Sequence, residues 1–447
     1  MCYKVCVWEE PSFGKCLAIH QIIRARFPQI SKDIHGNPRI HLNSAAGTLV
    51  VDTASRAAAQ ASTWLNSLPG EVFPAETTTA QFQGAIREIA ADFLNARDPE
   101  EVSFHFSSTQ ALFNAALSMR GLIRAKNNLV VTDLDHLANI SPWESVGGKW
   151  WGAQVRRARI LDTGALDADH LLSLVDGATA LVAVTMASNA LGTIVPLAAL
   201  IPEIRKKSPE CVVCVDAVHH ALHGPVDVRS LDCDLLVFSG YKVFGPMLGV
   251  MWGKRSLLDR MKPFRVETNK NDPPFKFEQG TLNNASLASL GAALRYIVWL
   301  ADELDPQLAG EDRRSKFKRA MTAVSVYERE LSRKTLVGFR NFKPEQFYLY
   351  GLAGPDDAGL RDPTFAFEIP GLDARDIKRR LWEIAGIQTA EGNHYSAVFY
   401  RHYRKDSVCR ASFAHYNSPA DADTLVEAIE RIIPRAEDSF GRDETGP

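Results

Sequence analysis

Short apolar runs alternate with helix-length amphipathic segments along most of the chain, from about residue 40 to residue 261. Apolar runs of roughly four to eight residues between turn signals are typical of buried strands, and apolar positions three and four residues apart are typical of helices. The predicted strands are 102–106, 128–132, 154–160, 180–185, 212–216, 235–239 and 250–252. The predicted helices between them include 80–94, 111–123, 167–175 and 197–207. This alternation predicts an α/β fold with a mostly parallel seven-stranded sheet covered by helices.

The pattern changes towards the C-terminus. Two long helical stretches, 285–304 and 316–335, precede a mixture of predicted strands (364–368 and 408–413) and helices (374–384 and 420–433). This mixture predicts a smaller α+β domain. A helix at 17–27 and a turn at 35–38 come before the alternating region. We therefore expect an N-terminal segment (1–40) that packs on the small domain, a large domain (41–300) and a small C-terminal domain (301–447).

Composition narrows the class of protein. Of the 447 residues, 46% are hydrophobic and 23% are charged, which is ordinary for a globular protein. The net charge of −2 gives no reason to expect nucleic acid or an anionic membrane as a partner. No apolar stretch approaches ~20 residues, and residues 1–10 lack the apolar core of a signal peptide. These observations favour a cytoplasmic enzyme.

Seven cysteines are scattered along the chain, and two of them, Cys211 and Cys214, form a C-x-x-C pair. Such a pair is typical of zinc or redox sites. Here it lies inside a predicted strand, where residues three apart point to opposite faces. We therefore expect buried thiols and no metal.

The segment 238–245, Phe-Ser-Gly-Tyr-Lys-Val-Phe-Gly, carries the most informative chemistry. It places Lys242 in a tight turn after a predicted strand, and an amine in apolar surroundings becomes nucleophilic because desolvation disfavours its ammonium form. Asp216 ends another predicted strand. A lysine for a Schiff base and an acid for the pyridine nitrogen are what pyridoxal 5'-phosphate (PLP) needs. Taken singly, a solvated loop lysine and a strand-end turn residue are the commoner interpretations.

Other strand ends support the PLP hypothesis. Ser107-Ser-Thr-Gln110 precedes a helix, where hydroxyls and free N–H groups favour an anion, although an ordinary N-cap is the simpler reading. In a parallel sheet, ligands bind beyond the carboxyl ends of the strands. Five such ends carry an anion-binding group, an imidazole, an amide, an acid and an amine: Thr109, His136, Asn189, Asp216 and Lys242.

These stretches resemble the class V aminotransferases of the fold-type I PLP enzymes, a family that includes the cysteine desulfurases. The resemblance runs from about residue 42 to residue 417 and is most specific in 136–143, 216–219, 239–242 and 277–281. It implies PLP as the cofactor, a small amino acid as the substrate, and a homodimer with a shared active site.

The resemblance also implies roles for individual residues. Lys242 would form the Schiff base and move protons at Cα, Asp216 would pair with the pyridine nitrogen, and His136 would stack on the ring. The other implied cofactor-binding residues are Ser108, Thr109, Gln110, Asn189, His219, Ser239, Tyr241 and, from the partner subunit, Thr281. The implied substrate-binding residues are Arg410, which would grip the carboxylate, with Asn189, Asn43 and Tyr395. His219 stands where the desulfurases usually have glutamine, and Tyr241 stands where they usually have histidine.

One departure from the family concerns a loop cysteine whose thiolate removes sulfur in the desulfurases. The matching stretch here is Gly392-Asn-His-Tyr-Ser396, with Tyr395 at the cysteine's position. A phenol cannot accept sulfane sulfur as a thiolate does. Cys409 lies next to Arg410 on a predicted strand and not on the loop. The sequence therefore argues against desulfurase activity.

Further stretches, 41–48, 132–136, 216–223 and 266–270, are similar to a branch of the family in fungal loline alkaloid biosynthesis. The resulting hypothesis is a PLP enzyme that forms a Cα carbanion (quinonoid) from an amino acid and closes a ring by Mannich-type C–C bond formation. The alternative within the family is a cysteine desulfurase, cysteine lyase or epimerase. Two further alternatives are a cofactor-bearing scaffold without turnover and a metal hydrolase built on His219, His220 and His223. For the hydrolase, the sequence shows no acidic partner at ligand spacing.

Overall fold

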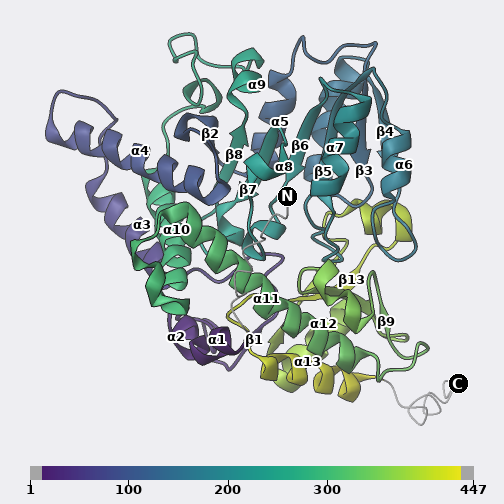
Figure 1. Cartoon of the computed structure of the whole chain (residues 1–447). Coiled ribbons are helices and arrows are strands. Elements are labelled where there is room, and N and C mark those ends of the chain that lie inside the picture. The colour runs from purple at the N-terminus through teal and green to yellow at the C-terminus, as the bar shows by residue number, and fades with distance from the viewer. Residues whose placement is uncertain (1–12, 434–447) are drawn as a thin grey trace, which may run out of the picture.

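The computed structural model describes residues 13–433, and its largest element is a seven-stranded sheet in the order β2-β8-β7-β6-β5-β3-β4 (Figure 1). The strands are β2 (Val102–His105), β3 (Asn128–Thr132), β4 (Gln154–Ala158), β5 (Thr179–Thr185), β6 (Val212–Asp216), β7 (Leu235–Ser239) and β8 (Gly249–Gly253). In this order, the five strands β7, β6, β5, β3 and β4 run parallel to their neighbours. Strand β8 is antiparallel to both β7 and β2. The predicted mostly parallel seven-stranded sheet is confirmed.

Successive residues of each strand point to opposite faces of the sheet, and here the residues on both faces are apolar. Helices therefore cover both faces. Val130, Val182 and Val213 belong to one core cluster, which also contains Ile86, Ile201 and Leu290 of the covering helices. Leu129, Leu181 and Cys214 belong to a second cluster, with Leu112 and Ala115 of helix α5. The covering helices are α4 (Pro74–Leu94), α5 (Ser108–Ser118), α6 (Ala168–Ser173), α7 (Leu197–Lys207), α8 (Val228–Leu231), α9 (Arg255–Arg260) and α10 (Asn284–Leu304). Helix α3 (Asp52–Trp64) packs against α10.

The two cysteines of the C-x-x-C pair lie in different core clusters, Cys211 in the first and Cys214 in the second. Both thiols are buried, and burial raises the pKa of Cys211 to about 12. The prediction of buried thiols on opposite faces of a strand is confirmed.

A second, antiparallel sheet has the order β12-β13-β10-β9 and lies below the large sheet in Figure 1. Its strands are β9 (Tyr348–Leu349), β10 (Thr364–Glu368), β12 (Ala390–Gly392) and β13 (Val408–Ser412). The helices around it are α11 (Arg313–Phe339), α12 (Ala374–Ala385) and α13 (Pro419–Ile432). Aromatic side chains such as Phe339, Phe365 and Phe367 fill the core between them. The C-terminal part therefore has the predicted mixture of strands and helices.

The N-terminal part differs from the single helix predicted at 17–27. It forms two short helices, α1 (Phe13–Ala18) and α2 (His20–Ala25), separated at Ile19. Helix α1 packs against α11, and β1 (Ile40–His41) pairs with β11 (Ile387–Gln388) in a small parallel sheet. The exact domain boundaries at 40/41 and 300/301 stay a prediction.

No helix within residues 13–433 is both long and apolar enough to cross a membrane. Residues 1–10, on which the expectation of no signal peptide rests, lie outside the described residues. The cytoplasmic location stays a prediction.

Candidate active site

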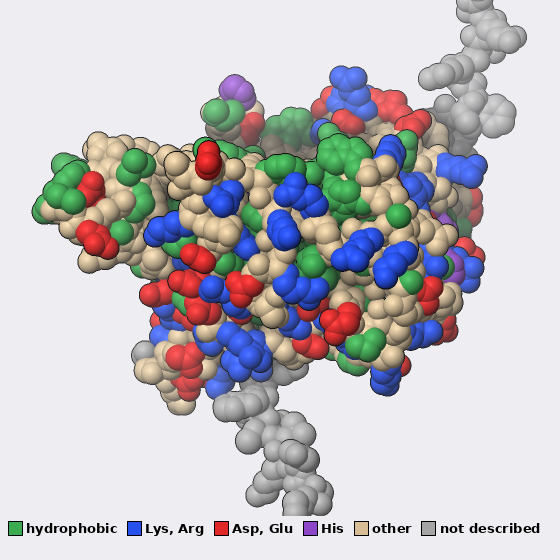
Figure 2. Space-filling view, turned by 90° about the horizontal axis from the view of Figure 1, so that it is seen from above, with side chains coloured by type: hydrophobic (Ala, Val, Ile, Leu, Met, Phe, Trp, Pro, Cys, Tyr) green, Lys and Arg blue, Asp and Glu red, His purple; other side chains and the backbone are tan. Residues whose placement is uncertain are grey.

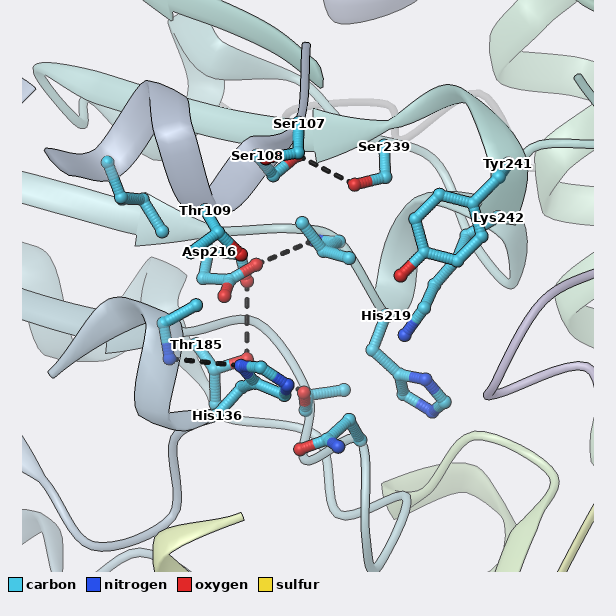
Figure 3. A pocket seen from close by; sticks show the side chains of 15 residues that line it. Ser107, Ser108, Thr109, His136, Thr185, Asp216, His219, Ser239, Tyr241 and Lys242 are labelled. Atoms are coloured by element: carbon cyan, nitrogen blue, oxygen red, sulfur yellow. Dashed lines mark hydrogen bonds between the residues drawn. The ribbon is translucent and has the colours of Figure 1, made fainter. Parts of the chain in front are cut away.

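A pocket with an empty volume of about 550 Å³ opens at the carboxyl ends of β5, β6 and β7 (Figure 3). It brings together most of the residues that the sequence singled out. Its lining consists of Ser107, Ser108, Thr109, Leu112, His136, Ala138, Thr185, Ala187, Asn189, Asp216, Val218, His219, Ser239, Tyr241 and Lys242.

Lys242 reaches this pocket from the short 3-10 turn η5 (Gly240–Lys242), which follows β7 directly. The turn needs glycine at 240, because a Cβ there would lie 2.8 Å from the carbonyl oxygen of Pro246. The Lys242 side chain is buried, with 5% exposed, and burial lowers its pKa from 10.5 to about 7. The nearby Arg410 cation lowers this pKa further, whereas Asp216 opposes the shift. A large fraction of the amine is therefore neutral and nucleophilic near pH 7.

Asp216 ends β6 and is buried in the same pocket. The backbone N–H of Val218 donates to its Oδ1 at 2.8 Å. Burial raises the pKa of Asp216 to about 6, although that hydrogen bond and the Lys242 cation both favour the carboxylate. The acid and the amine predicted from separate strands thus face one cavity and influence each other's charge.

His136 lies on another wall of the pocket, at the start of the short turn η2 (Leu137–Asn139). Its Nδ1 accepts a hydrogen bond from the backbone N–H of Ala138 at 3.0 Å, which leaves the proton on Nε2. Burial, together with the Lys242 and Arg410 cations, lowers the pKa of His136 to about 4. The ring is therefore neutral at physiological pH and offers a flat surface on which an aromatic ligand can stack.

The loop at 392–396 lies beside His136. Its Tyr395 carbonyl oxygen accepts from the Leu137 N–H at 2.8 Å, and the Tyr395 ring lies 5.9 Å from the His136 ring. The Tyr395 side chain itself is 71% exposed and does not line the pocket.

One end of the pocket is suited to an anion. Ser107 caps helix α5, and the Ser108 hydroxyl lies 2.7 Å from both the Phe238 carbonyl oxygen and the Ser239 hydroxyl. Gly249 of β8 permits this close packing, because a Cβ there would lie 2.3 Å from the Ser107 carbonyl carbon. Free N–H groups at the start of α5 and the helix dipole favour a phosphate at this position.

Two predicted substrate-binding residues, Arg410 and Asn43, do not line the pocket themselves, but Arg410 contacts Asn189, which does. Arg410 of β13 is buried, and its Nη1 donates to the Asn189 carbonyl oxygen at 2.6 Å, while its buried Nε has no partner within residues 13–433. Burial lowers the pKa of Arg410 to about 10, so the guanidinium stays charged at neutral pH. Asn43 pairs with Ser412, two positions after Arg410 on the same strand.

Two predicted cofactor residues lie elsewhere in the described chain. Gln110 and Thr281 line a second cavity, and the Gln110 Oε1 accepts from the Phe106 N–H at 2.9 Å. Thr281 is exposed on the surface of its own chain. Both placements leave the predicted roles of these residues untested.

Sequence reasoning did not single out Thr185 and Asp135. Thr185 ends β5 and lines the pocket, so the rule about strand ends could have found it. Asp135 is fully buried beside Asp216, and burial raises its pKa to about 8. The Asn139 amide donates to Asp135 at 2.6 Å, an arrangement that only the folded chain reveals.

The residues present fit PLP. Beyond the lysine, the acid and the anion-binding turn, three buried polar atoms around the pocket have no partner within the described chain: Asn189 Oδ1, His219 Nδ1 and Arg410 Nε. Buried polar atoms are normally hydrogen-bonded, so their presence here indicates a polar ligand.

A mostly parallel sheet with a buried lysine and a buried acid at its strand ends defines a PLP-dependent enzyme of fold type I. The chain belongs to the class V aminotransferase family, whose profile matches residues 40–306 and 317–425. Enzymes of this family use pyridoxal 5'-phosphate.

The similar proteins include cysteine desulfurases. That of Pectobacterium atrosepticum is 32% identical over 431 residues, which cover 92% of this chain and 97% of the relative. One from Yersinia pestis (strain Pestoides F) is 31% identical over 432 residues, with the same coverage. Among solved structures, the S-sulfonic acid form of the cysteine desulfurase CsdA from Escherichia coli gives a TM-score of 0.75 at 26% identity, covering 92% of this chain and 98% of that chain. The predicted resemblance to the family is thereby confirmed, while the closer resemblance to its loline branch stays a prediction.

Proposed function

We propose that this protein binds PLP with a small α-amino acid and removes the proton from the amino acid's Cα. PLP, when bound, supplies a ring that draws electrons away from Cα. The observation that carries the proposal is the shared pocket of Lys242 and Asp216, two buried groups of opposite charge at the ends of adjacent strands.

Each residue's environment matches a task. The Lys242 amine, with its pKa near 7, can accept a proton and return it at neutral pH. Asp216 supplies the negative charge that holds a pyridine nitrogen in its protonated form. Arg410 supplies a buried cation for the substrate carboxylate, a pairing that suits guanidinium geometry. The neutral ring of His136 supplies a flat surface for stacking.

The comparisons favour cysteine as the substrate. The relatives named above are cysteine desulfurases, and their similarity extends over nearly the whole chain. They therefore support the alternative of a cysteine desulfurase, cysteine lyase or epimerase more than the hypothesis of C–C bond formation in alkaloid biosynthesis.

One feature of the site favours a reaction without sulfur transfer to the protein. The five cysteines within residues 13–433 are all buried, and burial raises the pKa of Cys409 to about 12. A thiol with such a pKa is not a nucleophile at neutral pH. The loop position is occupied by Tyr395, whose phenol cannot take up sulfur. For this reason we keep Mannich-type C–C bond formation as a second candidate, beside a cysteine lyase or epimerase.

The decisive experiment follows exchange at Cα. The PLP-loaded protein is incubated in D₂O with cysteine, alanine and other small amino acids, and deuterium at Cα is measured by mass spectrometry. We expect exchange that disappears in Lys242→Ala and persists in Lys276→Ala, a matched variant of a buried lysine outside the pocket. Absence of exchange with every amino acid would refute the proposal.

The products then separate the candidates. With an added thiol reductant, which converts sulfane sulfur to sulfide, alanine and sulfide from cysteine would support the desulfurase. Pyruvate, ammonia and sulfide, formed without a reductant, would support the lyase, and inversion of Cα alone would support the epimerase. Exchange without any of these products would direct the search to substrates that carry an internal electrophile, as ring closure requires.

We further propose that two copies form a homodimer with a shared active site. Helices α3 and α4 form a projecting arm, and apolar side chains are exposed near its tip: Trp64, Leu68, Val72 and Phe73 (Figures 1 and 2). Exposed apolar groups of this size are typical of interaction surfaces. Thr281 is exposed away from its own pocket, as a residue that serves the partner's site would be.

The test of this arrangement mixes Lys242→Ala subunits with Thr281→Val subunits. If Thr281 acts across the interface, the hybrid dimer contains one complete site and gains activity over either parent. If Thr281 acts within its own chain, mixing restores nothing. Light scattering after gel filtration measures whether the dimer exists.

A further inference from the structure

The neutral ring of His219 can carry its proton on either Nδ1 or Nε2, and the surroundings of the two nitrogen atoms differ. His219 lines the pocket beside the end of the Lys242 side chain (Figure 3). Its Nε2 lies 3.3 Å from the hydroxyl oxygen of Thr364 on β10, whereas its buried Nδ1 has no partner within residues 13–433. The neutral ring carries one proton, and the neighbours decide which nitrogen holds it.

The acidic groups behind this ring are already engaged. The Asp362 carboxylate lies 3.1 Å from the Nδ1 of His220 and 3.9 Å from the Nε2 of His219. The Glu328 carboxylate lies 2.7 Å from the Nδ1 of His223. Thr364 is therefore the one side chain in the described structure within hydrogen-bond distance of the His219 ring.

The charges around His219 keep it neutral. Burial lowers the pKa of its ring well below the ordinary value, and His223, Lys242 and Arg410 add to this effect. A doubly protonated ring, which would donate from both nitrogens, is therefore disfavoured at neutral pH.

The Thr364 hydroxyl selects between the two remaining forms. Thr364 is fully buried, and the Nε2 of His219 is the partner found for its hydroxyl within residues 13–433. If Nε2 carried the proton, the hydroxyl would accept it and its own O–H would remain without an acceptor, which is costly in a buried place. If Nε2 is bare, the hydroxyl donates to it and both groups are satisfied.

We propose that Thr364 is a positioning residue whose hydroxyl donates to Nε2 of His219 and thereby keeps the ring proton on Nδ1, as a donor to the pocket. The identity of the acceptor rests on the proposed function: it is the phenolic oxygen of PLP. A glutamine at position 219 would always have an amide N–H to donate. A neutral histidine has an N–H on Nδ1 only in one tautomer, which the Thr364 hydroxyl selects.

A metal ion is the competing explanation for the same cluster. Ligand atoms of His219, His223 and Asp362 all lie within 4.8 Å of one another, and the Nε2 of His223 has no partner in the described chain. Asp362 is already paired with His220, so we favour the hydrogen-bonded arrangement and make metal binding an outcome of the test.

The experiment compares Thr364→Val, which keeps the shape and removes the hydroxyl, with Thr364→Ser, which keeps the hydroxyl. Nitrogen-15 NMR of histidine-labelled protein, with and without PLP, reports which nitrogen of His219 is protonated. We expect the proton on Nδ1 in the wild type and in Thr364→Ser, and a mixture or Nε2 protonation in Thr364→Val. We also expect Thr364→Val to weaken PLP binding about fivefold, the equivalent of one net hydrogen bond of about 1 kcal/mol.

A second background separates this role from a general packing effect. In His219→Gln the amide supplies its own donor, so adding Thr364→Val should leave PLP affinity and the cofactor's absorption band unchanged. Equal protonation in wild type and Thr364→Val would overturn the proposal, as would an equal loss of affinity in both backgrounds. One equivalent of zinc or another divalent metal in the purified protein, removed by His223→Gln, would also overturn it. Failure of the wild type to bind PLP would instead refute the proposed function and leave the NMR result without cofactor to decide this inference.

Discussion

Replacing Lys242 by methionine should make the cofactor-free protein more stable at neutral pH, although it removes the proposed catalytic amine. Lys242 is 5% exposed, and its burial, together with the nearby Arg410 cation, outweighs the attraction of Asp216 and disfavours the ammonium form. Methionine has a similar length and no charge to desolvate. The Lys242 amine therefore serves the proposed function at the expense of the stability of the folded protein.

The size of the effect follows from the pKa of Lys242. The difference between 10.5 and about 7 corresponds to a penalty of about 5 kcal/mol for the charged folded form. Relaxation and water entry around the amine reduce this value, so we expect a gain of about 2–5 kcal/mol.

The sign of the pH dependence is fixed by linkage. The unfolded chain holds the Lys242 proton more tightly than the folded chain, so the penalty is complete below about pH 7. It shrinks as the pH rises and vanishes above 10.5, where the amine is neutral in both states. The advantage of the methionine variant should therefore be large near pH 6.5 and small near pH 10.

Urea unfolding of the cofactor-free proteins at these two pH values provides the assay. Lys276→Met is the matched control, because Lys276 is also buried but its Nζ donates to the Met261 carbonyl oxygen at 2.9 Å. Its removal should lower the urea midpoint. The reasoning fails if Lys242→Met is less stable than the wild type near pH 6.5, or if its advantage is the same near pH 10.

Three other changes test the site. Activity should fall as the pH drops through about 6, where Asp216 takes up a proton, and Asp216→Asn should remove this limb of the pH–rate profile along with most of the activity. Arg410→Gln should raise the KM for the amino acid about 10- to 100-fold while PLP stays bound, as titrations with each ligand would show. Gly249→Val should lower PLP affinity and cost about 1–3 kcal/mol of stability, because the new side chain displaces the backbone of Ser107; urea unfolding and PLP titration measure both.

The strands that carry the site could be predicted closely from the sequence. The apolar runs at 128–132, 212–216 and 235–239 coincide with β3, β6 and β7, because strands buried on both faces have no polar interruption until they end. Helix starts were harder to place. Helix α5 begins at Ser108, three residues before the predicted start, because the Ser107 cap and not the first apolar residue sets the beginning of the helix.

Contacts between distant segments could not be predicted from local pattern. Thr364 at the start of β10 and Asp362 just before it lie beside His219, which follows β6, and no periodicity links positions more than 140 residues apart. The metal hypothesis illustrates this limit, since the sequence showed no acid near the histidines and the fold brings Asp362 to them. Arg410 was identified through family resemblance alone, and the structure places it at the Asn189 carbonyl oxygen.

The charges of the pocket link the fold to the ligands proposed for it. Asp216 is the one carboxylate that lines the pocket in the described chain, whereas two buried cations, Lys242 and Arg410, contribute to keeping the rings of His136 and His219 neutral. In the free protein, burial disfavours the charged form of each of these two groups, as their lowered pKa values show. A phosphate at the start of α5 and a carboxylate at Arg410 would supply the missing negative charge. The same desolvated cations that lower the stability of the free protein would then give the bound protein its affinity, because a ligand that binds only the folded state stabilises it by mass action.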